Sequence, residues 1–217
     1  MIKVSSLKRT SVYSIVGMNV IIILLAIIMK WTLFDLLFAY WVENLSVGIF
    51  NIMKMIKSQG GIDDSSEGSA VPAGCLKIFM VPFFLVHFFG FCFGHLLAIL
   101  SLYSGQLNGW DGHIPDIINY IDPSTFLIAF VMTMISHGVS FATNFIGKKE
   151  YEKATIVKLM FAPYKRIVLV HLVIIAGAFL LVAKGDIQSV LLLIPFFAAK
   201  LILDIILHLR EHRETAI

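Results

Sequence analysis

The sequence predicts an all-α integral membrane protein, a bundle of six transmembrane helices with both termini in the cytoplasm. Three observations predict this fold class. Of the 217 residues, 59% are hydrophobic and only 14% are charged, whereas a soluble domain carries about 25% charged residues. Six segments reach the length of about 20 mostly apolar residues that a membrane crossing needs. Taking these segments as crossings puts most basic residues on one side of the membrane.

The six predicted spans form a single domain over residues 1–217. They cover residues 11–29, 31–57, 76–104, 123–147, 166–184 and 187–209. The first is predicted to be a retained helix, because its apolar stretch is long for a signal peptide and no small-residue cleavage motif follows it. The second is interrupted by Asp35, Glu43, Asn44 and Asn51, so its crossing has to be tested against the charges of the loops.

The positive-inside rule supports all six crossings, the second included. Six crossings put 14 of the 17 Lys and Arg residues on the cytoplasmic side, the others being Lys30, Lys184 and Lys200. The predicted outer loop 105–122 has neither Lys nor Arg. If residues 31–57 did not cross, every later loop would change sides and the bias would be lost. We therefore expect a multi-pass protein of the cell (inner, cytoplasmic) membrane.

Two cytoplasmic connectors differ in composition. Residues 58–76 are rich in Gly and Ser, which predicts a flexible connector. Residues 149–162 fit either a short helix on the cytoplasmic surface or an ordinary polar connector, and the sequence favours neither. The two cysteines, Cys75 and Cys92, are too far apart along the third span for a disulfide.

The composition also excludes several classes of protein. A net charge of +3, spread over short clusters, speaks against nucleic-acid binding. The high apolar content excludes intrinsic disorder, and two cysteines are too few for a disulfide scaffold. The predicted partners are the lipid bilayer and a lipid or small-molecule ligand, and the sequence is compatible with a homo-oligomer.

Ionisable residues inside the spans are the candidate functional residues, because a charge in hydrocarbon is costly and faces the bundle interior. Counting about 1.5 Å per residue from the nearest cytoplasmic basic residue places Glu43, His87 and His137 about 15–17 Å deep, near the midplane. A second tier lies about 5–9 Å deep by the same count. This tier contains Asn51, Asn144, His171 and Asp204. Only His95 and Asp35 lie towards the outer side.

The helical periodicity groups these residues into polar stripes. Asn44 and Asn51 are seven residues apart, as are His137 and Asn144, so each pair shares a helix face. We expect a polar cavity that opens to the cytoplasm, with the catalytic residues Glu43, His87 and His137 at its floor. The predicted lining residues are Asn44, Asn51, Ser140, Asn144, His171, Asp204 and His208.

A carboxylate with two imidazoles is a ligand set that binds zinc or non-haem iron, so Glu43, His87 and His137 are also the candidate metal ligands. Two other interpretations stay open. His87 and His137 could ligate a haem iron axially, or the polar residues could simply hydrogen-bond the helices together. There is no HExxH motif of a zinc protease in the sequence.

Three stretches carry a resemblance to a known family. They are Asp35-Leu-Leu-Phe-Ala-Tyr-Trp-Val-Glu-Asn44, Ser136-His-Gly-Val-Ser-Phe and Asn144-Phe-Ile-Gly-Lys, together with the pair Asp204 and His208. The sequence resembles an uncharacterised prokaryotic family of polytopic membrane proteins, the domain-of-unknown-function family 6498. The resemblance implies a small polytopic protein, and it carries no activity to transfer.

Three functions are compatible with the polar site. The first is a membrane-embedded enzyme in which Glu43 or a metal-bound water acts as the base, and the sequence favours it slightly. The second is a small proton-coupled transporter, in which His and Asp side chains relay protons. The third is an accessory membrane subunit whose polar residues only pack helices.

Overall fold

The computed structural model describes residues 21, 24–61, 73–103, 123–168, 171, 172 and 175 of the chain. These residues form helices and the turns between them, and the β-structure among them is an isolated parallel bridge between Gly60 and Thr155. The all-α prediction is therefore confirmed for this part of the chain.

The chain forms two compact units. One is Leu37–Ile174, and the other combines Met1–Leu36 with Ile175–Ile217. The larger unit contains all the contacts of the candidate site below. The prediction of a single domain stays a prediction.

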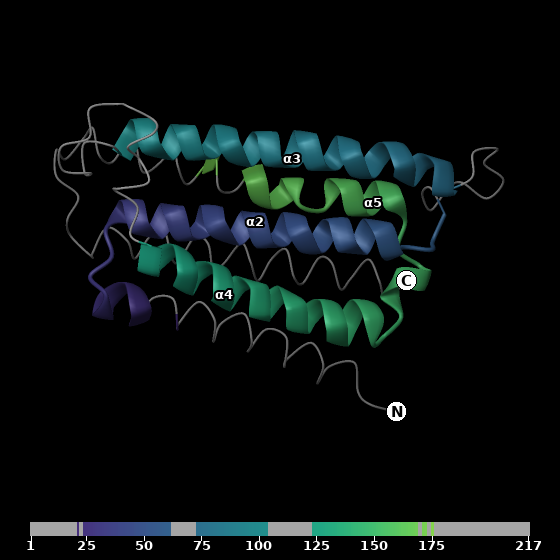
Figure 1. Ribbon diagram of the computed structural model, residues 1–217, viewed down its shortest axis with the longest axis horizontal. Coiled ribbons are helices and arrows are strands. Elements are labelled where there is room, and N and C mark those ends of the chain that lie inside the picture. The colour runs from purple at the N-terminus through teal and green to yellow at the C-terminus, as the bar shows by residue number, and fades with distance from the viewer. Residues whose placement is uncertain are drawn as a thin grey trace. The chain divides into compact units, whose positions relative to one another are not determined.

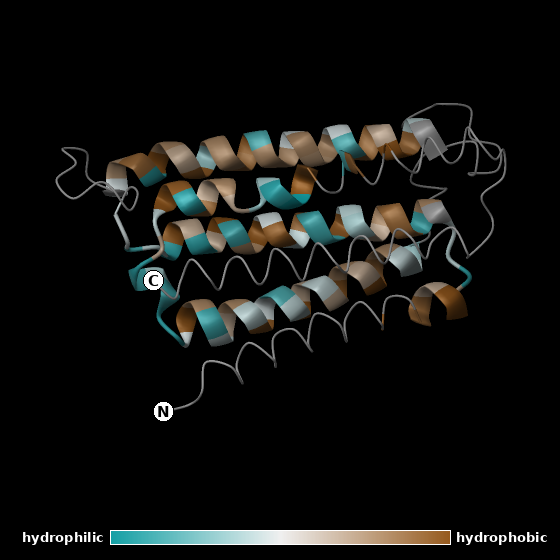
Figure 2. Ribbon diagram, turned by 180° about the vertical axis from the view of Figure 1, so that it is seen from behind, coloured by the Kyte–Doolittle hydropathy of each residue, from teal (hydrophilic) through white to brown (hydrophobic). Residues whose placement is uncertain are grey.

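Three helices in the described part of the chain are long and apolar enough to cross a membrane. They are α2 (Leu33–Lys57), α3 (Ala73–Tyr103) and α4 (Pro123–Ser140), which continues into a π-helical segment, Phe141–Ile146 (Figure 1). Figure 2 shows hydrophobic residues along all three. They match the second, third and fourth predicted spans, including the second, which polar residues interrupt.

The other predicted spans lie mainly outside the described residues. Of span 11–29, residue 21 and residues 24–28 are helical. Span 166–184 is described only at residues 166–168, 171, 172 and 175, and span 187–209 lies wholly outside. Six crossings and the sidedness of the termini thus stay predictions.

Helix α2 begins with a capping box that accounts for Asp35. The amide and hydroxyl of Thr32 both donate to Oδ2 of Asp35 at 2.8 Å, and the amide of Asp35 donates back to the Thr32 hydroxyl at 3.2 Å. This reciprocal pattern satisfies amides that the first turn of a helix leaves without partners. Asp35 therefore interrupts the apolar pattern because it defines the start of the helix.

Helices α2 and α3 pack antiparallel at close range. Trp41 Nε1 donates to the Cys92 carbonyl at 2.7 Å, and Lys77 at the other end of α3 donates to the Ile56 carbonyl at 3.2 Å. Between these contacts Gly48 faces Phe88, and a Cβ added at Gly48 would lie 2.5 Å from Cε1 of the ring. A small residue here lets the two backbones approach closely, as is common between membrane helices.

Helices α2 and α4 run parallel to each other. Phe38 lies near Phe126, and Phe50 lies near Phe141, with ring centroids 6.3 and 5.8 Å apart. Between them the Ser46 and Thr133 hydroxyls are hydrogen-bonded at 2.8 Å. Residue numbers therefore increase in the same direction along both helices, as expected for the second and fourth of consecutive membrane spans.

Residues 149–162 contain a short helix, one of the two expected alternatives, and one side of this helix is buried. After a 3-10 turn at Glu150–Glu152, helix α5 (Ile156–Phe161) packs beside α3 and α2, with Ile156 fully buried in the core. The core cluster also contains Met55, Phe84, Phe88, Cys92 and Ile167. The segment enters the bundle because Ile156, Val157, Leu159 and Met160 give it an apolar side that the core accommodates.

The close approach at Gly48 gives a first test of the packing. We expect Gly48→Ala to lower the free energy of unfolding by about 1–3 kcal/mol, because the methyl group overlaps the buried Phe88 ring. Gly90→Ala in α3 is the matched control, because a Cβ there meets nothing within 4 Å. Unfolding of the detergent-purified variants would be compared, and equal stability of the two would contradict the packing described here.

Candidate functional site

Glu43 lies near the middle of α2, nine residues after Phe34 and 14 before Lys57, the limits of the membrane-length segment. Its carboxylate forms an ion pair with the guanidinium of Arg166, through Oε1 and Nη2. Both side chains are largely buried, with 14% and 21% of their surface exposed. A carboxylate and a guanidinium thus neutralise each other inside the bundle.

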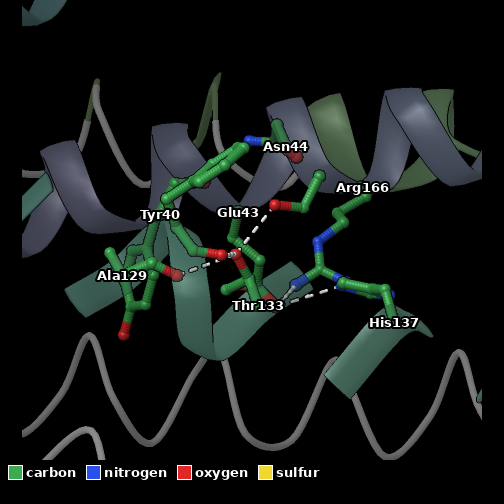
Figure 3. A network of polar contacts seen from close by, with 9 residues as sticks. Tyr40, Glu43, Asn44, Ala129, Thr133, His137 and Arg166 are labelled. Carbon is green, nitrogen blue, oxygen red and sulfur yellow. Dashed lines mark hydrogen bonds and ion pairs between the residues drawn. The ribbon is translucent and has the colours of Figure 1, made fainter. Parts of the chain in front are cut away.

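His137 of α4 joins this pair. Its Nε2 lies 3.9 Å from the same Oε1 of Glu43, and its side chain is 27% exposed. Figure 3 shows His137 and Arg166 reaching the Glu43 carboxylate together. We call Glu43, His137 and Arg166 the Glu43 group. It joins α2, α4 and the turn that follows α5 at one point.

Hydroxyl and amide groups next to the Glu43 group are satisfied largely within the helices. Thr133, one turn before His137, donates to the Ala129 carbonyl at 2.8 Å (Figure 3). Its hydroxyl is also hydrogen-bonded to that of Ser46. Asn44 Nδ2 donates to the Tyr40 carbonyl at 3.1 Å. Oδ1 of Asn44 is buried and, within the part of the chain that the structure describes, has no hydrogen-bond partner.

Pro163 brings Arg166 to the site. Proline has no amide hydrogen, so the carbonyl of Leu159 in α5 lacks its usual donor four residues ahead. Asn51 of α2 takes this place, and its Nδ2 donates to the Leu159 carbonyl at 2.9 Å. The helix restarts after Pro163, where the amides of Arg166 and Ile167 donate to the Pro163 carbonyl at 3.0 and 3.2 Å. Asn51 therefore holds a broken helix.

His87 is not part of the Glu43 group. Its Nδ1 lies 2.6 Å from the Tyr164 hydroxyl, and its ring stacks on Phe83. Among the described residues, no cluster of three or more His, Cys, Asp and Glu is arranged to hold a metal ion. The placement therefore gives no support to a zinc or iron site made of Glu43, His87 and His137. The haem alternative, which needs His87 and His137 on one iron, gains no support either.

The remaining predicted residues are dispersed. His171 lies beside His95, with Nδ1 and Nε2 3.0 Å apart, which pairs a residue expected near the cytoplasmic side with one expected near the outer side. Asn144 and Ser140 contact each other at 3.4 Å at the start of the π-helical segment. Asp204 and His208 lie outside the described residues.

Sequence reasoning missed Arg166, because the positive-inside count treats it as a cytoplasmic anchor of the fifth span. Thr155 and Ile156 are already buried, about two helical turns before Pro163, so the chain enters the bundle well before Arg166. One signal could have suggested this, namely the apolar run from Ile156 to Phe161 immediately before Pro163.

The role of Asn51 can be tested with a double variant. We expect Asn51→Leu, which keeps the volume but loses the donor, to cost about 1–3 kcal/mol of unfolding free energy, because the partly buried Leu159 carbonyl loses its bond. In a Pro163→Ala background the loss should fall by more than half, since residue 163 then has an amide to offer. An equal loss in both backgrounds, measured by unfolding in detergent, would refute this role.

Comparison with known proteins gives a single kind of match. Neither the curated proteins nor the solved structures contain a match to the sequence. A model of a family of unknown function, DUF6498, matches residues 1–216. The match covers nearly the whole chain and confirms the predicted resemblance. The chain belongs to the DUF6498 family of unknown function.

Proposed function

We propose that the chain is a six-span protein of the cytoplasmic membrane that works as a small proton-coupled carrier, with Glu43 as the residue that takes up the proton. One observation carries this proposal, namely the Glu43 group in the middle of the membrane-length helices. Ionisable residues inside membrane-spanning helices are costly, and they mark proton relays and substrate pathways.

The chemistry of the three side chains supports proton coupling. A guanidinium keeps its charge under all ordinary conditions, whereas a carboxylate and an imidazole both exchange protons. Protonation of Glu43 would weaken its ion pair with the guanidinium of Arg166. Because neutralising one partner of a buried ion pair is costly, protonation favours a second arrangement of the segment that carries Arg166. A proton-dependent change between two arrangements is what a carrier needs.

The break at Pro163 supports movement of that segment. Broken helices that supply binding residues near the midplane are a recurring feature of membrane carriers. Here Pro163 interrupts the backbone hydrogen bonds of the helix, and the amides of Arg166 and Ile167 donate to the Pro163 carbonyl. Asn51 holds the break through one hydrogen bond. Tyr164, through its bond to His87, and Ile167, in the core cluster, also hold this segment and would shift together with Arg166.

The enzyme function, which the sequence slightly favours, has less support than the carrier. It depended on His87 acting with Glu43 and His137, whereas His87 is bonded to Tyr164. An accessory role remains the main competitor, since the Glu43 group also ties three segments together. The two functions differ in whether protons move with a solute, and this difference can be measured.

The test uses the purified full chain in liposomes that contain the pH-sensitive dye pyranine. Neutral sugars, amino acids and carboxylates would be added outside, one at a time, at equal pH on both sides. We expect one of these classes to acidify the interior in the wild type and not in Glu43→Gln, because the variant cannot exchange the proton. Glu152→Gln, at an exposed position outside the long helices, is the matched control and should behave as wild type.

Proton entry that persists unchanged in Glu43→Gln would overturn the assignment of Glu43. No proton entry with any class, from a protein whose thermal unfolding shows it to be folded, would favour the accessory role.

A further inference from the structure

We propose that His95 and His171 form a second proton-binding site, in which the two rings share one proton, and that the proton of the carrier enters from the outer side through this pair. This inference rests on the proposed function and names the residues that supply the proton to Glu43. The juxtaposition that carries it is the contact between Nε2 of His95, in α3, and Nδ1 of His171, which lie 3.0 Å apart.

The two rings of this pair lie in different surroundings. His95 is buried, with 7% of its surface exposed, whereas His171 is exposed. The backbone of Phe91, one helical turn before His95, is the other hydrogen-bond partner of the His95 ring. A carbonyl only accepts, so His95 donates its one hydrogen there, and its Nε2 accepts from His171. The second ring nitrogen of neutral His171 then carries a lone pair that can bind a proton.

The short contact sets how many protons the pair holds. Two imidazoles at this distance need one N–H group and one lone pair between them. When one proton is added, the charged ring donates to the neutral ring, and such a charge-assisted bond is roughly twice as strong as a neutral one. A second proton would bring two N–H groups face to face, so the rings would have to separate. The pair therefore takes up one proton as a unit.

The pair lies on the side of Glu43 that is predicted to face outside. The hydrogen bond from Trp41 to the Cys92 carbonyl marks positions of α2 and α3 at a similar level. Glu43 comes two residues after Trp41. His95 comes three residues after Cys92 and lies in the opposite direction, because the helices are antiparallel. The two levels are therefore about 7.5 Å apart, and a proton from the outer end reaches the pair first.

Other titratable side chains on the surrounding elements have contacts of their own. They are His87 and Cys92 on α3, Tyr164 and Arg166 on the segment after Pro163, and Glu43 on α2. His87 is bonded to Tyr164, and Arg166 is ion-paired with Glu43. Among the described residues, His171 is the ionisable group that acts electrostatically on the His95 ring. The protonation of the pair can therefore be followed separately from that of Glu43.

Nuclear magnetic resonance of the detergent-purified full chain, labelled with nitrogen-15 in its histidines, tests the shared proton. We expect the ring signals of His95 and His171 to change together as the pH falls from about 8 to about 5, the range in which imidazoles titrate. They should show one midpoint and the uptake of one proton. Two rings that each take up a proton independently over this range would overturn the inference.

Glutamine variants assign the two signals. His95→Gln and His171→Gln each keep a hydrogen-bonding side chain at the contact but lose a ring that titrates. One folded variant is enough, because its own signal disappears and the signal of the partner ring shifts. His87→Gln is the matched control, since His87 bonds to a hydroxyl rather than to a second imidazole. The joint titration of the pair should persist in this control.

Proton entry into the pyranine liposomes tests the place of the pair in the carrier. At an outer pH of about 7.5, we expect His171→Gln to slow solute-driven proton entry roughly tenfold, because the pair no longer supplies protons. The initial rate in the wild type should also depend on outer pH with the midpoint found by magnetic resonance, and the variant should lose this midpoint. A role in helix packing alone would leave the pH profile unchanged, and that result would overturn the assignment.

The two proposals can fail separately. If the rings share one proton but no solute carries protons into the liposomes, the proton-binding pair stands and the carrier falls. If a solute carries protons while the two rings titrate independently, the carrier stands and the shared proton falls.

Discussion

The need of one buried guanidinium for a counter-ion governs the arrangement of this bundle. Arg166 cannot lose its charge, and its side chain is only 21% exposed among membrane-length helices. Glu43, in the middle of α2, supplies a negative charge to Arg166, and His137 of α4 lies near the same carboxylate oxygen. Any change of protonation at this point alters the balance of charge where three segments meet. Structure and proposed function therefore depend on the same contact.

The rest of the larger unit brings Arg166 to that contact. Gly48 lets α2 and α3 approach until the glycine backbone meets the Phe88 ring, and the core cluster seats α5 beside them. Pro163 then ends α5, and Asn51 supplies the donor that the proline lacks. Asn51 and Pro163 are far apart in sequence, but the side-chain amide of Asn51 replaces the hydrogen-bond donor that Pro163 lacks. A break in the helix is thereby held without leaving the partly buried Leu159 carbonyl unsatisfied.

The long helices could be predicted from apolar length, and the proximity of Glu43 and His137 could be predicted from their depth. The depth of a residue in the membrane does not determine which neighbouring segment its side chain contacts. His87, at a similar predicted depth, contacts Tyr164 instead. Arg166 was missed because counting basic residues treats every cation near a predicted span end as an anchor. Its position depends on packing of α5, and such contacts between distant segments leave no periodic pattern in the sequence.

The most direct test of this account is a double-variant cycle on Glu43 and Arg166, measured as the free energy of unfolding of the full chain in detergent. The account predicts that Glu43→Gln and Arg166→Gln each cost about 3 kcal/mol, because each removes one partner of a largely buried ion pair. The combined variant should then lose at least about 1 kcal/mol less than the sum of the two single losses. Strictly additive losses would show that the two side chains do not interact, and the account would fail.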